Sequence, residues 1–354
     1  MNTLQRIEAF VSLGQFLKQF STDELGNTNH PLNEQFYSEF ADLIEHSYVE
    51  NAWFTPSHVR ASIAGICTFL DKEKLNKWLA NYAISDENTG IRVAVIMAGN
   101  IPMVGFHDML SVLISGHHFI GKLSSKDNRL LDFIARLLGE IQPEFNSLIT
   151  FKNERLDGKQ DFDAIIATGS NNSARYFEAY FGKYPNIIRR NRNSVALLTG
   201  KETEEELHNL GQDVFLYFGL GCRNVSKLYV PENYDITKLL DTWQDYAPAV
   251  DHNKYTNNHD YQRSLYLMNA VKHYDNGFLL LKEDIAIASP IAVLFYEHYK
   301  DIEQVKIKLT ENKENIQCIV GQMDDTIPFG KAQQPGLNDY ADNVDTMAFL
   351  SQLN

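Results

Sequence analysis

The sequence predicts an α/β fold in which a doubly wound parallel sheet is followed by a second, smaller α/β unit. Three observations support this. From residue 92 onward, short apolar runs typical of buried parallel strands alternate with helical stretches. Several of these runs end in small and polar residues, and the alternation starts again after the polar segment RRNRN at residues 189–193. The chain of 354 residues is long enough for two such domains, each with its own core.

The domain boundaries follow from the same pattern. We expect a first domain over residues 1–190, a second over residues 191–332, and a C-terminal segment, 333–354, that returns to the first domain. The segment RRNRN is a candidate hinge. Two interpretations of it stay open, a solvated turn and a binding site for a cofactor phosphate.

The first 90 residues are predicted to be helical. Thr55-Pro56 has the signature of a helix start, with an N-cap threonine and a proline in the first turn. Apolar residues follow at helical spacing over 59–70, and no residue in this part indicates chemistry.

The doubly wound part begins at the apolar run 92–97. Ligands in such folds bind beyond the carboxyl ends of the strands. Two strand ends, AGNIP at 98–102 and TGS at 168–170, carry small and polar residues there. The predicted strands cover 92–97, 118–122, 148–151 and 164–167, and the predicted helices cover 106–115, 130–138 and 176–180.

The second unit repeats the alternation in a shorter form. A helix is predicted over 201–218, and it leads into the segment YFGLGCRNV at 217–225. Further strands are predicted at 195–198, 228–230 and 291–295, with helices around 239–243 and 265–268.

Charge and composition exclude several classes of protein. A formal net charge of −14 argues against non-specific nucleic-acid binding, although a small anionic cofactor needs only a local pocket. The longest apolar runs are too short to span a bilayer, and the first residues lack the pattern of a signal peptide.

The three cysteines are far apart in sequence and form neither a disulfide framework nor a metal-ligand spacing, so we expect a cytoplasmic protein. The histidine pairs lack partners at ligand spacing, and we expect no metal site.

Cys222 is the candidate nucleophile. A lone cysteine is more often an inert, buried small residue. Here, flanking glycines allow close backbone approach, Arg223 supplies positive charge that favours a thiolate, and the segment lies at a helix-to-strand junction. GLGCRN partly resembles a dinucleotide-binding glycine motif, but it follows a helix rather than a strand, so that interpretation is weak.

Three other positions have a functional and a plain interpretation. Asn100 is either an ordinary turn residue or an amide that donates to a developing oxyanion. Lys122 is either a surface lysine or a ligand of a cofactor ribose or phosphate. Thr168, Gly169 and Ser170 either let a cofactor approach closely or cap the following helix.

Taken together, these segments resemble the aldehyde dehydrogenase superfamily, and more specifically its fatty acyl-CoA reductase branch known from bacterial bioluminescence, the LuxC-like reductases. The segments that carry the resemblance lie between residues 92 and 346. They are Gly99–Pro102, Gly121–Ser125, Thr168–Ser170, Gly221-Cys222, Glu283-Asp284 before Ser289-Pro290, Pro328–Gly330 and Asp339–Thr346.

The resemblance implies an aldehyde-dehydrogenase-like fold, with a Rossmann-type cofactor domain and a smaller catalytic domain. It implies that Cys222 is the catalytic thiol and that the amide of Asn100 helps to form the oxyanion hole. It also implies that Lys122 and Ser124 bind the cofactor ribose.

The resemblance further implies that Thr168, Gly169 and Ser170 lie beside the nicotinamide and that Glu283 binds the nicotinamide ribose. The spacing from Glu283 to Pro290 is longer than in the family. Aldehyde-oxidising members also carry a glutamate that activates water, and near its expected place this chain has RRNRN, without a carboxylate.

The resemblance therefore implies reduction of an acyl thioester, a fatty acyl-CoA or an acyl-protein, to an aldehyde through a thioacyl-cysteine. NADPH is the implied reductant, with NADH as the other possibility. An acyl-transferase or synthetase partner and a homo-oligomer are implied by the same analogy. Two alternatives stay open, a non-acylating aldehyde dehydrogenase that uses NAD(P)⁺ and a non-catalytic binding subunit of the same fold.

Overall fold

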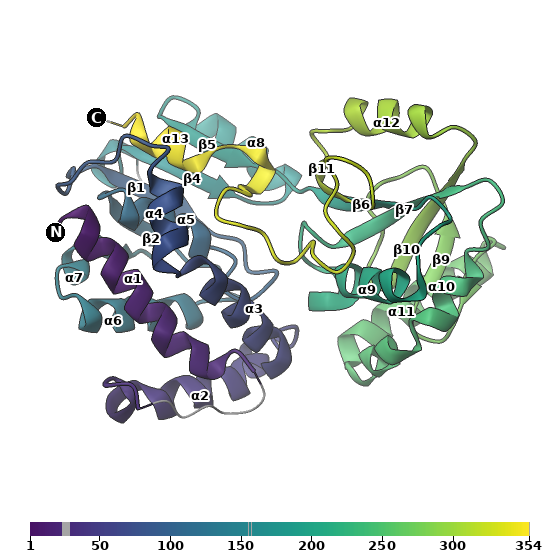
Figure 1. The fold of residues 1–354 in the computed structure, drawn as a ribbon, viewed down its shortest axis with the longest axis horizontal. Helices are drawn as coiled ribbons and strands as arrows, with labels where there is room; N and C mark the ends of the chain where they lie inside the picture. Colours follow the sequence, from purple (N-terminus) through teal and green to yellow (C-terminus); the bar gives the residue numbers. More distant parts are fainter. Residues whose placement is uncertain (23–28, 155, 157, 354) are drawn as a thin grey trace. The chain divides into compact units, whose positions relative to one another are not determined.

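The computed structural model describes residues 1–22, 29–154, 156 and 158–353 (Figure 1). The chain divides into two compact units. The first consists of Met1–Arg190 with Gly336–Asn354, and the second of Asn191–Pro335.

The first unit begins with helices, as the sequence predicts. The helix start at Thr55-Pro56 is confirmed, because the Thr55 hydroxyl accepts a hydrogen bond from the His58 backbone N–H at 3.3 Å and Pro56 is the first helical residue. The four helices are α1 (Thr3–Leu17), α2 (Asn33–Glu50), α3 (Pro56–Phe69) and α4 (Lys72–Leu79).

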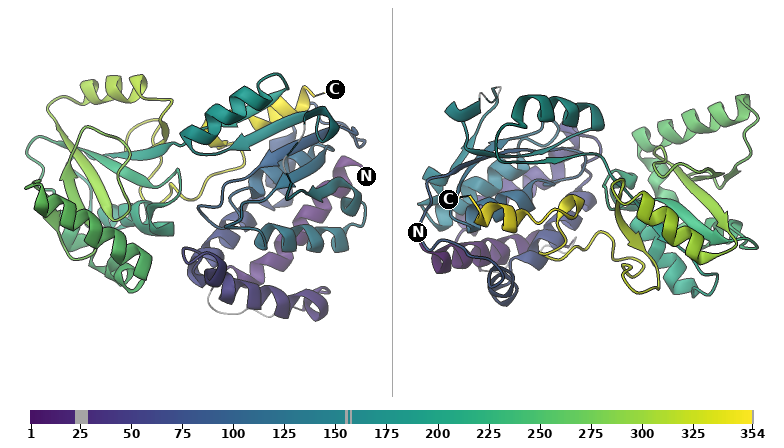
Figure 2. Two further views of the ribbon diagram at one scale, coloured as in Figure 1. Left: turned by 180° about the vertical axis from the view of Figure 1, so that it is seen from behind. Right: turned by 90° about the horizontal axis from the view of Figure 1, so that it is seen from above.

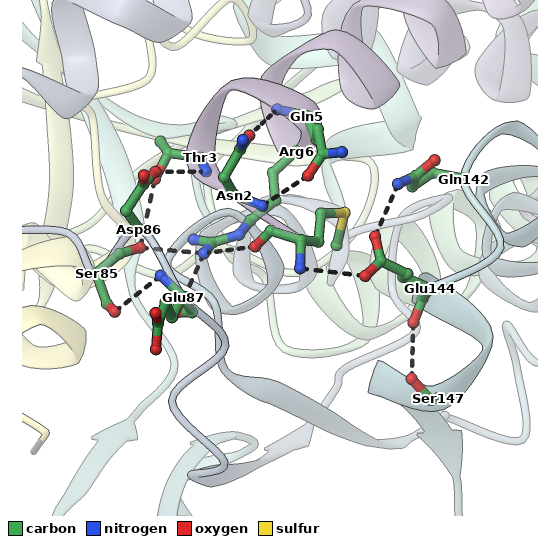
Figure 3. A network of polar contacts seen from close by, with 11 residues as sticks. Asn2, Thr3, Gln5, Arg6, Ser85, Asp86, Glu87, Gln142, Glu144 and Ser147 are labelled. Carbon is green, nitrogen blue, oxygen red and sulfur yellow. Dashed lines mark hydrogen bonds and ion pairs between the residues drawn. The ribbon is translucent and has the colours of Figure 1, made fainter.

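A fully buried arginine anchors α1 (Figure 3). The Arg6 guanidinium donates to the carbonyl of Ile114 at 2.9 Å, and to the carbonyls of Ser85 at 3.0 Å and Glu87 at 3.2 Å. These carbonyls belong to the end of helix α5 (Phe106–Ile114) and to the segment before the first strand. The buried charge is thus surrounded by acceptors and joins three parts of the unit.

The first sheet is entirely parallel, with the strand order β3-β2-β1-β4-β5. Because the strand order reverses between β1 and β4, the carboxyl ends of these two strands form the switch point at which doubly wound sheets bind ligands. The strands are β1 (Arg92–Ile96), β2 (His118–Lys122), β3 (Ile149–Phe151), β4 (Ala164–Thr168) and β5 (Asn186–Arg189).

Both faces of this sheet are covered. Val93 and Val95 of β1 belong to the larger core, with α1, α5, α6 (Leu130–Ile141) and α7 (Phe145–Leu148). Ala94, between them, belongs to a second core with Phe177 of helix α8 (Asn171–Phe181). Successive strand residues therefore pack on opposite faces, as in a doubly wound domain.

Arg189, the first residue of RRNRN, is buried rather than exposed in a solvated turn. It ends β5 and is only 4% exposed, and its two terminal nitrogens bind the Asp108 carboxylate at 2.6 and 2.9 Å. It also donates to the Thr346 hydroxyl at 2.9 Å. The interpretation of a solvated turn is therefore wrong for Arg189, whose ion pair joins β5, α5 and helix α13 (Thr346–Ser351).

The C-terminal segment belongs to the first unit. Helix α13, yellow in Figure 2, packs against α5. Before it, the Tyr340 hydroxyl accepts a hydrogen bond from the Trp78 indole N–H at 2.8 Å and lies 2.8 Å from the Tyr82 hydroxyl. These bonds attach the segment to the end of α4.

The second unit contains a sheet with the strand order β11-β6-β7-β10-β9-β8, which is parallel except for β8. Its strands are β6 (Asn193–Leu197), β7 (Val225–Pro231), β8 (Tyr274–Asp275), β9 (Leu280–Glu283), β10 (Val293–Tyr299) and β11 (Ile316–Val320). Its helices are α9 (Glu204–Phe215), α10 (Thr237–Thr242), α11 (Asn253–Met268) and α12 (Ile302–Glu311). None of the helices in the described ranges is long and apolar enough to cross a membrane.

Helix α9 is shorter than predicted. It starts with a capping box, in which Thr203 accepts from the Glu206 backbone N–H while the Glu206 carboxylate accepts from Thr203. It ends at Phe215, because Tyr217 and Phe218 both have left-handed backbone angles, with φ of 56° and 55°. The helix predicted to extend to residue 218 therefore gives way to a short 3₁₀ segment, Leu216–Gly219.

Candidate active site

Cys222 lies in a turn between the 3₁₀ segment Leu216–Gly219 and strand β7. The predicted helix-to-strand junction is thus confirmed. The residue is half-buried. Among the described residues, none of the three cysteines is in a disulfide.

One buried side chain organises this turn. Asn224 is 2% exposed, and its side-chain oxygen accepts a hydrogen bond from the Gly221 backbone N–H at 2.8 Å. Its amide nitrogen donates to the carbonyls of Asp213 at 3.0 Å and Leu216 at 2.8 Å, with a longer contact to Val214 at 3.4 Å. A single asparagine therefore holds both the end of α9 and the residue before the cysteine.

The backbone leading to the thiol is strained. Tyr217 and Phe218 are consecutive non-glycine residues in the left-handed region, and Gly219 follows with a φ of 75°. Each such non-glycine residue costs on the order of 1–2 kcal/mol, so the surrounding contacts have to hold it. The Phe218 ring packs against His252 with a centroid separation of 4.4 Å. Backbone strain of this kind is concentrated at functional sites.

Arg223 is tied to the end of the second unit. Its Nε donates to the carbonyl of Ala332. The buried carboxylate of Asp213 accepts from the backbone N–H groups of Gly330 at 2.7 Å and Ala332 at 2.9 Å. Burial raises the pKa of Asp213 to about 6, against the lowering effect of these two hydrogen bonds and of the Arg223 charge. The segment around Gly330 is thus held against α9, and the effect of Arg223 on the thiol stays a prediction.

The structure brings a second cysteine to the same turn. The Ser194 hydroxyl donates to the Cys222 carbonyl at 3.0 Å and lies 3.0 Å from the Cys318 sulfur. It also accepts from the Cys318 backbone N–H at 3.2 Å. Cys318 is 96 residues away in sequence but lies on β11, which pairs with β6, the strand of Ser194. Neither Ser194 nor Cys318 is predicted as a neighbour of Cys222, because nothing in the sequence indicates that β11 pairs with β6.

In the first unit, Asn100 follows β1 in a bend that neighbouring side chains hold from two sides. Asn51, at the end of α2, donates to the carbonyls of Gly99 at 3.4 Å and Lys126 at 3.3 Å. The Asp127 carboxylate accepts from the Met103 backbone N–H at 2.7 Å, and Met103 has a φ of 53°. Through Asn51, the first 90 residues therefore help to hold the bend that contains the candidate residue Asn100.

Ser124 packs directly against this bend. A Cβ at Gly99 would lie 2.7 Å from the Ser124 Cβ, so only glycine fits without a shift. The Ser124 hydroxyl accepts from the Lys126 backbone N–H at 3.2 Å. Because β1 and β2 are parallel neighbours, the predicted residues Asn100 and Ser124 lie on adjacent loops at one edge of the sheet.

Asp127 is the buried carboxyl of this edge. It is 6% exposed, and burial raises its pKa to about 7, with Met103 opposing the shift. Its other oxygen, Oδ1, is buried and makes no hydrogen bond within the described part of the chain. Neither Asp127 nor Asn51 was predicted to lie near Asn100, because a polar residue in a loop or at the end of a helix carries no signal of its own in the sequence.

Lys122 ends β2 and lines a cavity of about 920 Å³. Its ammonium group donates to the carbonyls of Asn153 at 3.3 Å and Glu154 at 2.8 Å, which use two of its three N–H donors within the described residues. The remaining lining is rich in aromatic rings, which suits a planar base. The cavity is lined by Ile96, Lys122, Leu156, Gly158, Tyr176, Phe177, Tyr180, Phe181, Lys183 and Tyr184.

Thr168 ends β4, and Ser170 caps helix α8 by accepting a hydrogen bond from the Ser173 backbone N–H at 3.2 Å. The plain interpretation, helix capping, is therefore correct for Ser170. A Cβ at Gly169 would lie 2.7 Å from the Ser173 Cβ. Capping does not conflict with cofactor binding, since the start of a helix at a sheet switch point also favours phosphate groups.

Glu283 ends β9 and is exposed. Beside it, the buried ammonium of Lys227 donates to the carbonyl of Asp284 at 2.7 Å and to the Glu297 carboxylate at 2.6 Å. Burial lowers the pKa of Lys227, while Glu297 opposes the shift. The loop after Glu283 is thus anchored to β7 and β10, and the role of Glu283 stays a prediction.

The histidines do not form a metal site in the described ranges, where no group of three His, Cys, Asp or Glu side chains is placed to hold an ion. His117 lies 2.6 Å from the Thr89 hydroxyl and 3.0 Å from the Leu350 carbonyl through its two ring nitrogens. It is a buried structural residue.

No protein-family model matches the sequence, and a comparison with curated proteins finds no match. Solved structures do match in fold. The NAD⁺ complex of an aldehyde dehydrogenase from Bacillus cereus has a TM-score of 0.61 at 13% identity, over 92% of this chain and 72% of that one. A Mycobacterium tuberculosis aldehyde dehydrogenase with NAD⁺ has a TM-score of 0.63 at 13% identity, over 92% and 74%.

An acetylating aldehyde dehydrogenase from Geobacillus thermoglucosidasius has a TM-score of 0.61 at 10% identity, over 96% of this chain and 84% of that one. The predicted aldehyde-dehydrogenase-like fold is therefore confirmed. At these identities the likeness concerns the fold, and the activity follows only from the residues of this chain.

Proposed function

We propose that the protein is an oxidoreductase that reduces an acyl-CoA thioester to an aldehyde with NADPH, through a thioacyl intermediate on Cys222. The observation that carries this proposal is the Cys222 turn. The thiol lies in a strained turn that buried side chains organise, within a fold like that of the aldehyde dehydrogenases, and backbone strain of this kind is concentrated at functional sites, which supports a role for Cys222 as the nucleophile.

The first step makes and breaks bonds at the thioester carbonyl. The Cys222 thiolate attacks the carbonyl carbon, the C–S bond to CoA then breaks, and CoA leaves as a thiol after taking up a proton. Charge develops on the carbonyl oxygen during the attack. We assign its stabilisation to the Asn100 side-chain amide and the Cys222 backbone N–H.

The residues that we propose to bind the cofactor lie in the first unit, except Glu283, which lies in the second. Within the described residues the Lys122 ammonium uses two of its three donors, so the third can bind a ribose hydroxyl, and the aromatic cavity next to it suits an adenine. Thr168, Gly169 and Ser170 join the carboxyl end of β4 to the N-terminus of α8, at the switch point of the first sheet. A bound NADPH supplies the hydride that converts the thioacyl group to the aldehyde and regenerates the thiol. Lys126, two residues after Ser124 and exposed, supports a preference for a 2′-phosphate.

The rival is a non-acylating aldehyde dehydrogenase that hydrolyses the thioacyl group with an activated water. The segment at 189–193 offers no carboxylate as a base, and Arg189 in it already forms a buried ion pair with Asp108. A thioester route does not need that base, because the leaving group is a thiol. These observations favour reduction.

A steady-state assay tests the proposal. Protein is mixed with NADPH and acyl-CoAs of several chain lengths, and NADPH absorbance and free thiol are followed together, with Cys222→Ala as the control. The proposal expects one thiol released per NADPH consumed with at least one chain length. The absence of thiol release with every acyl-CoA, together with robust oxidation of aldehydes by NAD⁺, would contradict it.

A further inference from the structure

We propose that Asn224 is a positioning residue, which sets the orientation of the Cys222 thiol by tying the N–H of Gly221, directly before the thiol, to the end of α9 and the 3₁₀ segment. This inference rests on the proposed role of Cys222 as nucleophile. The Asn224 side chain makes one short hydrogen bond to the Gly221 N–H and two to the carbonyls of Asp213 and Leu216, and its own backbone N–H donates to the Gly221 carbonyl at 3.1 Å.

The contacts require an amide. Its oxygen faces one N–H, that of Gly221, and its nitrogen faces carbonyl oxygens of α9 and of the 3₁₀ segment. Both hydrogens of the nitrogen are used by the two short bonds, to Asp213 and Leu216. No other side chain of this size supplies one acceptor and two donors, so the position is chemically specific.

The contacts also explain how the strain is held. Tyr217 and Phe218 turn the chain through the left-handed region directly after Leu216, whose carbonyl Asn224 binds. Asn224 binds Gly221 on the other side of this strained stretch. Without the amide, both ends of the stretch lose a bond and the backbone is released toward ordinary angles. Since Cys222 follows Gly221 directly, the thiol moves with it.

Ser194 secures the other side of Cys222. Its hydroxyl binds the Cys222 carbonyl at 3.0 Å, while Asn224 binds the N–H of the residue before it. The Gly221 N–H and the Cys222 carbonyl are therefore fixed by two side chains, one from the residue before β7 and one from β6. A displacement of about 1 Å at a reacting group can cost about a hundredfold in rate.

Asn224→Asp is the sharpest variant, because it keeps the size and the acceptor but places a carboxylate against three carbonyl oxygens. Asn276→Ala is the matched control. Asn276 also organises a loop of the second unit, accepting from Leu279 N–H at 2.9 Å and donating to the Leu240 carbonyl at 3.3 Å. It has no bond to the Cys222 turn within the described residues.

The experiment measures kcat, KM for NADPH, and the rate at which iodoacetamide alkylates Cys222, read by peptide mass spectrometry with Cys67 as internal reference. For folded Asn224→Asp we expect kcat to fall about a hundredfold, KM for NADPH to stay within about twofold, and the Cys222 alkylation rate to depart from wild type. Asn276→Ala should behave as wild type in all three.

A second variant covers the case in which Asn224→Asp does not fold. Ser194→Ala removes the hydroxyl on the other side of the thiol and should lower kcat in the same way, with KM for NADPH unchanged. Wild-type kcat and wild-type alkylation in a folded Asn224→Asp protein, or in Ser194→Ala if that is the folded variant, would overturn the assignment. If the wild-type protein does not reduce acyl-CoA, the proposed function fails, and the alkylation rates still decide whether Asn224 sets the thiol.

Discussion

The Asp127 carboxylate accepts a hydrogen bond from the Met103 backbone N–H at 2.7 Å, and this bond holds a buried residue with a left-handed φ of 53°. The bond fixes the far end of the bend that contains Asn100. It also places a carboxyl group in a buried position, which raises its pKa to about 7.

Asp127 makes stability depend on pH. The folded-state pKa of about 7 lies above the ordinary value of 3.8, so between these values the native state binds more protons than the unfolded state. This contribution to the free energy of unfolding is complete below pH 4 and is lost as the pH rises toward 7. We expect Asp127→Asn, which cannot ionise, to gain stability relative to wild type as the pH increases from 5 to 8. Thermal unfolding at each pH measures this, and parallel curves for the two proteins would contradict it.

The ion pair between Arg189 and Asp108 should be important for stability. Removing one partner of a buried pair leaves an uncompensated charge and costs about 3–5 kcal/mol. We expect Arg189→Ala to lower the free energy of unfolding by this amount in denaturant titration. The matched control is Arg190→Ala, since Arg190 pairs with Glu178 at the surface and such pairs contribute less than about 1 kcal/mol. Equal effects of the two substitutions would show that Arg189 is not a buried anchor.

Asn100→Ala tests the proposed oxyanion donor. Loss of one such donor typically lowers kcat by about a hundredfold or more. We expect this fall with little change in KM for NADPH, and with thermal stability close to wild type because Asn51 and Asp127 still hold the bend. Stopped-flow measurement of CoA release isolates the acylation step. A variant that releases CoA at the wild-type rate would remove Asn100 from the mechanism.

Lys122→Ala tests the proposed ribose contact. Two carbonyls fix its ammonium within the described residues, and we assign its third donor to the ribose, so its loss should weaken NADPH binding by about tenfold, while kcat at saturating NADPH stays near wild type. Fluorescence titration with NADPH gives the affinity directly. Lys183→Ala, which removes another lysine that lines the cavity, shows how much of the effect is general charge. Unchanged affinity in Lys122→Ala would place the ribose elsewhere.

The sequence predicted four of the five strands of the first sheet, because these are continuous apolar runs, but not the edge strand β5, Asn186–Arg189, which lies next to the polar segment RRNRN. The thiol turn was predicted only in part. The apolar spacing along the chain predicts the helix-to-strand junction at Cys222. It does not predict the left-handed pair Tyr217-Phe218, because Asn224 holds the ends of this stretch through hydrogen bonds that leave no trace in the spacing of residues. For the same reason the sequence predicts a helix up to residue 218, whereas α9 ends at Phe215.

Partners that are distant in sequence were missed altogether. Cys318 reaches Ser194 because β11 pairs with β6, and β11 carries no strand signal strong enough to be predicted. Arg189 resembled a solvated residue, because its neighbours are polar and its partner Asp108 lies 81 residues earlier. Asn51 and Asp127, which shape the bend at Asn100, are likewise ordinary polar residues until the fold brings them together.

The most direct test of the account is to trap the acyl group on the thiol. The protein is mixed with an acyl-CoA in the absence of NADPH, and the peptide that contains Cys222 is analysed by mass spectrometry. The account predicts an increase by the mass of the acyl group on Cys222, equimolar CoA release, no adduct in Cys222→Ser, and disappearance of the adduct with formation of aldehyde when NADPH is added. Absence of an acyl adduct on Cys222 with every chain length, or an equal adduct in Cys222→Ser, would contradict it.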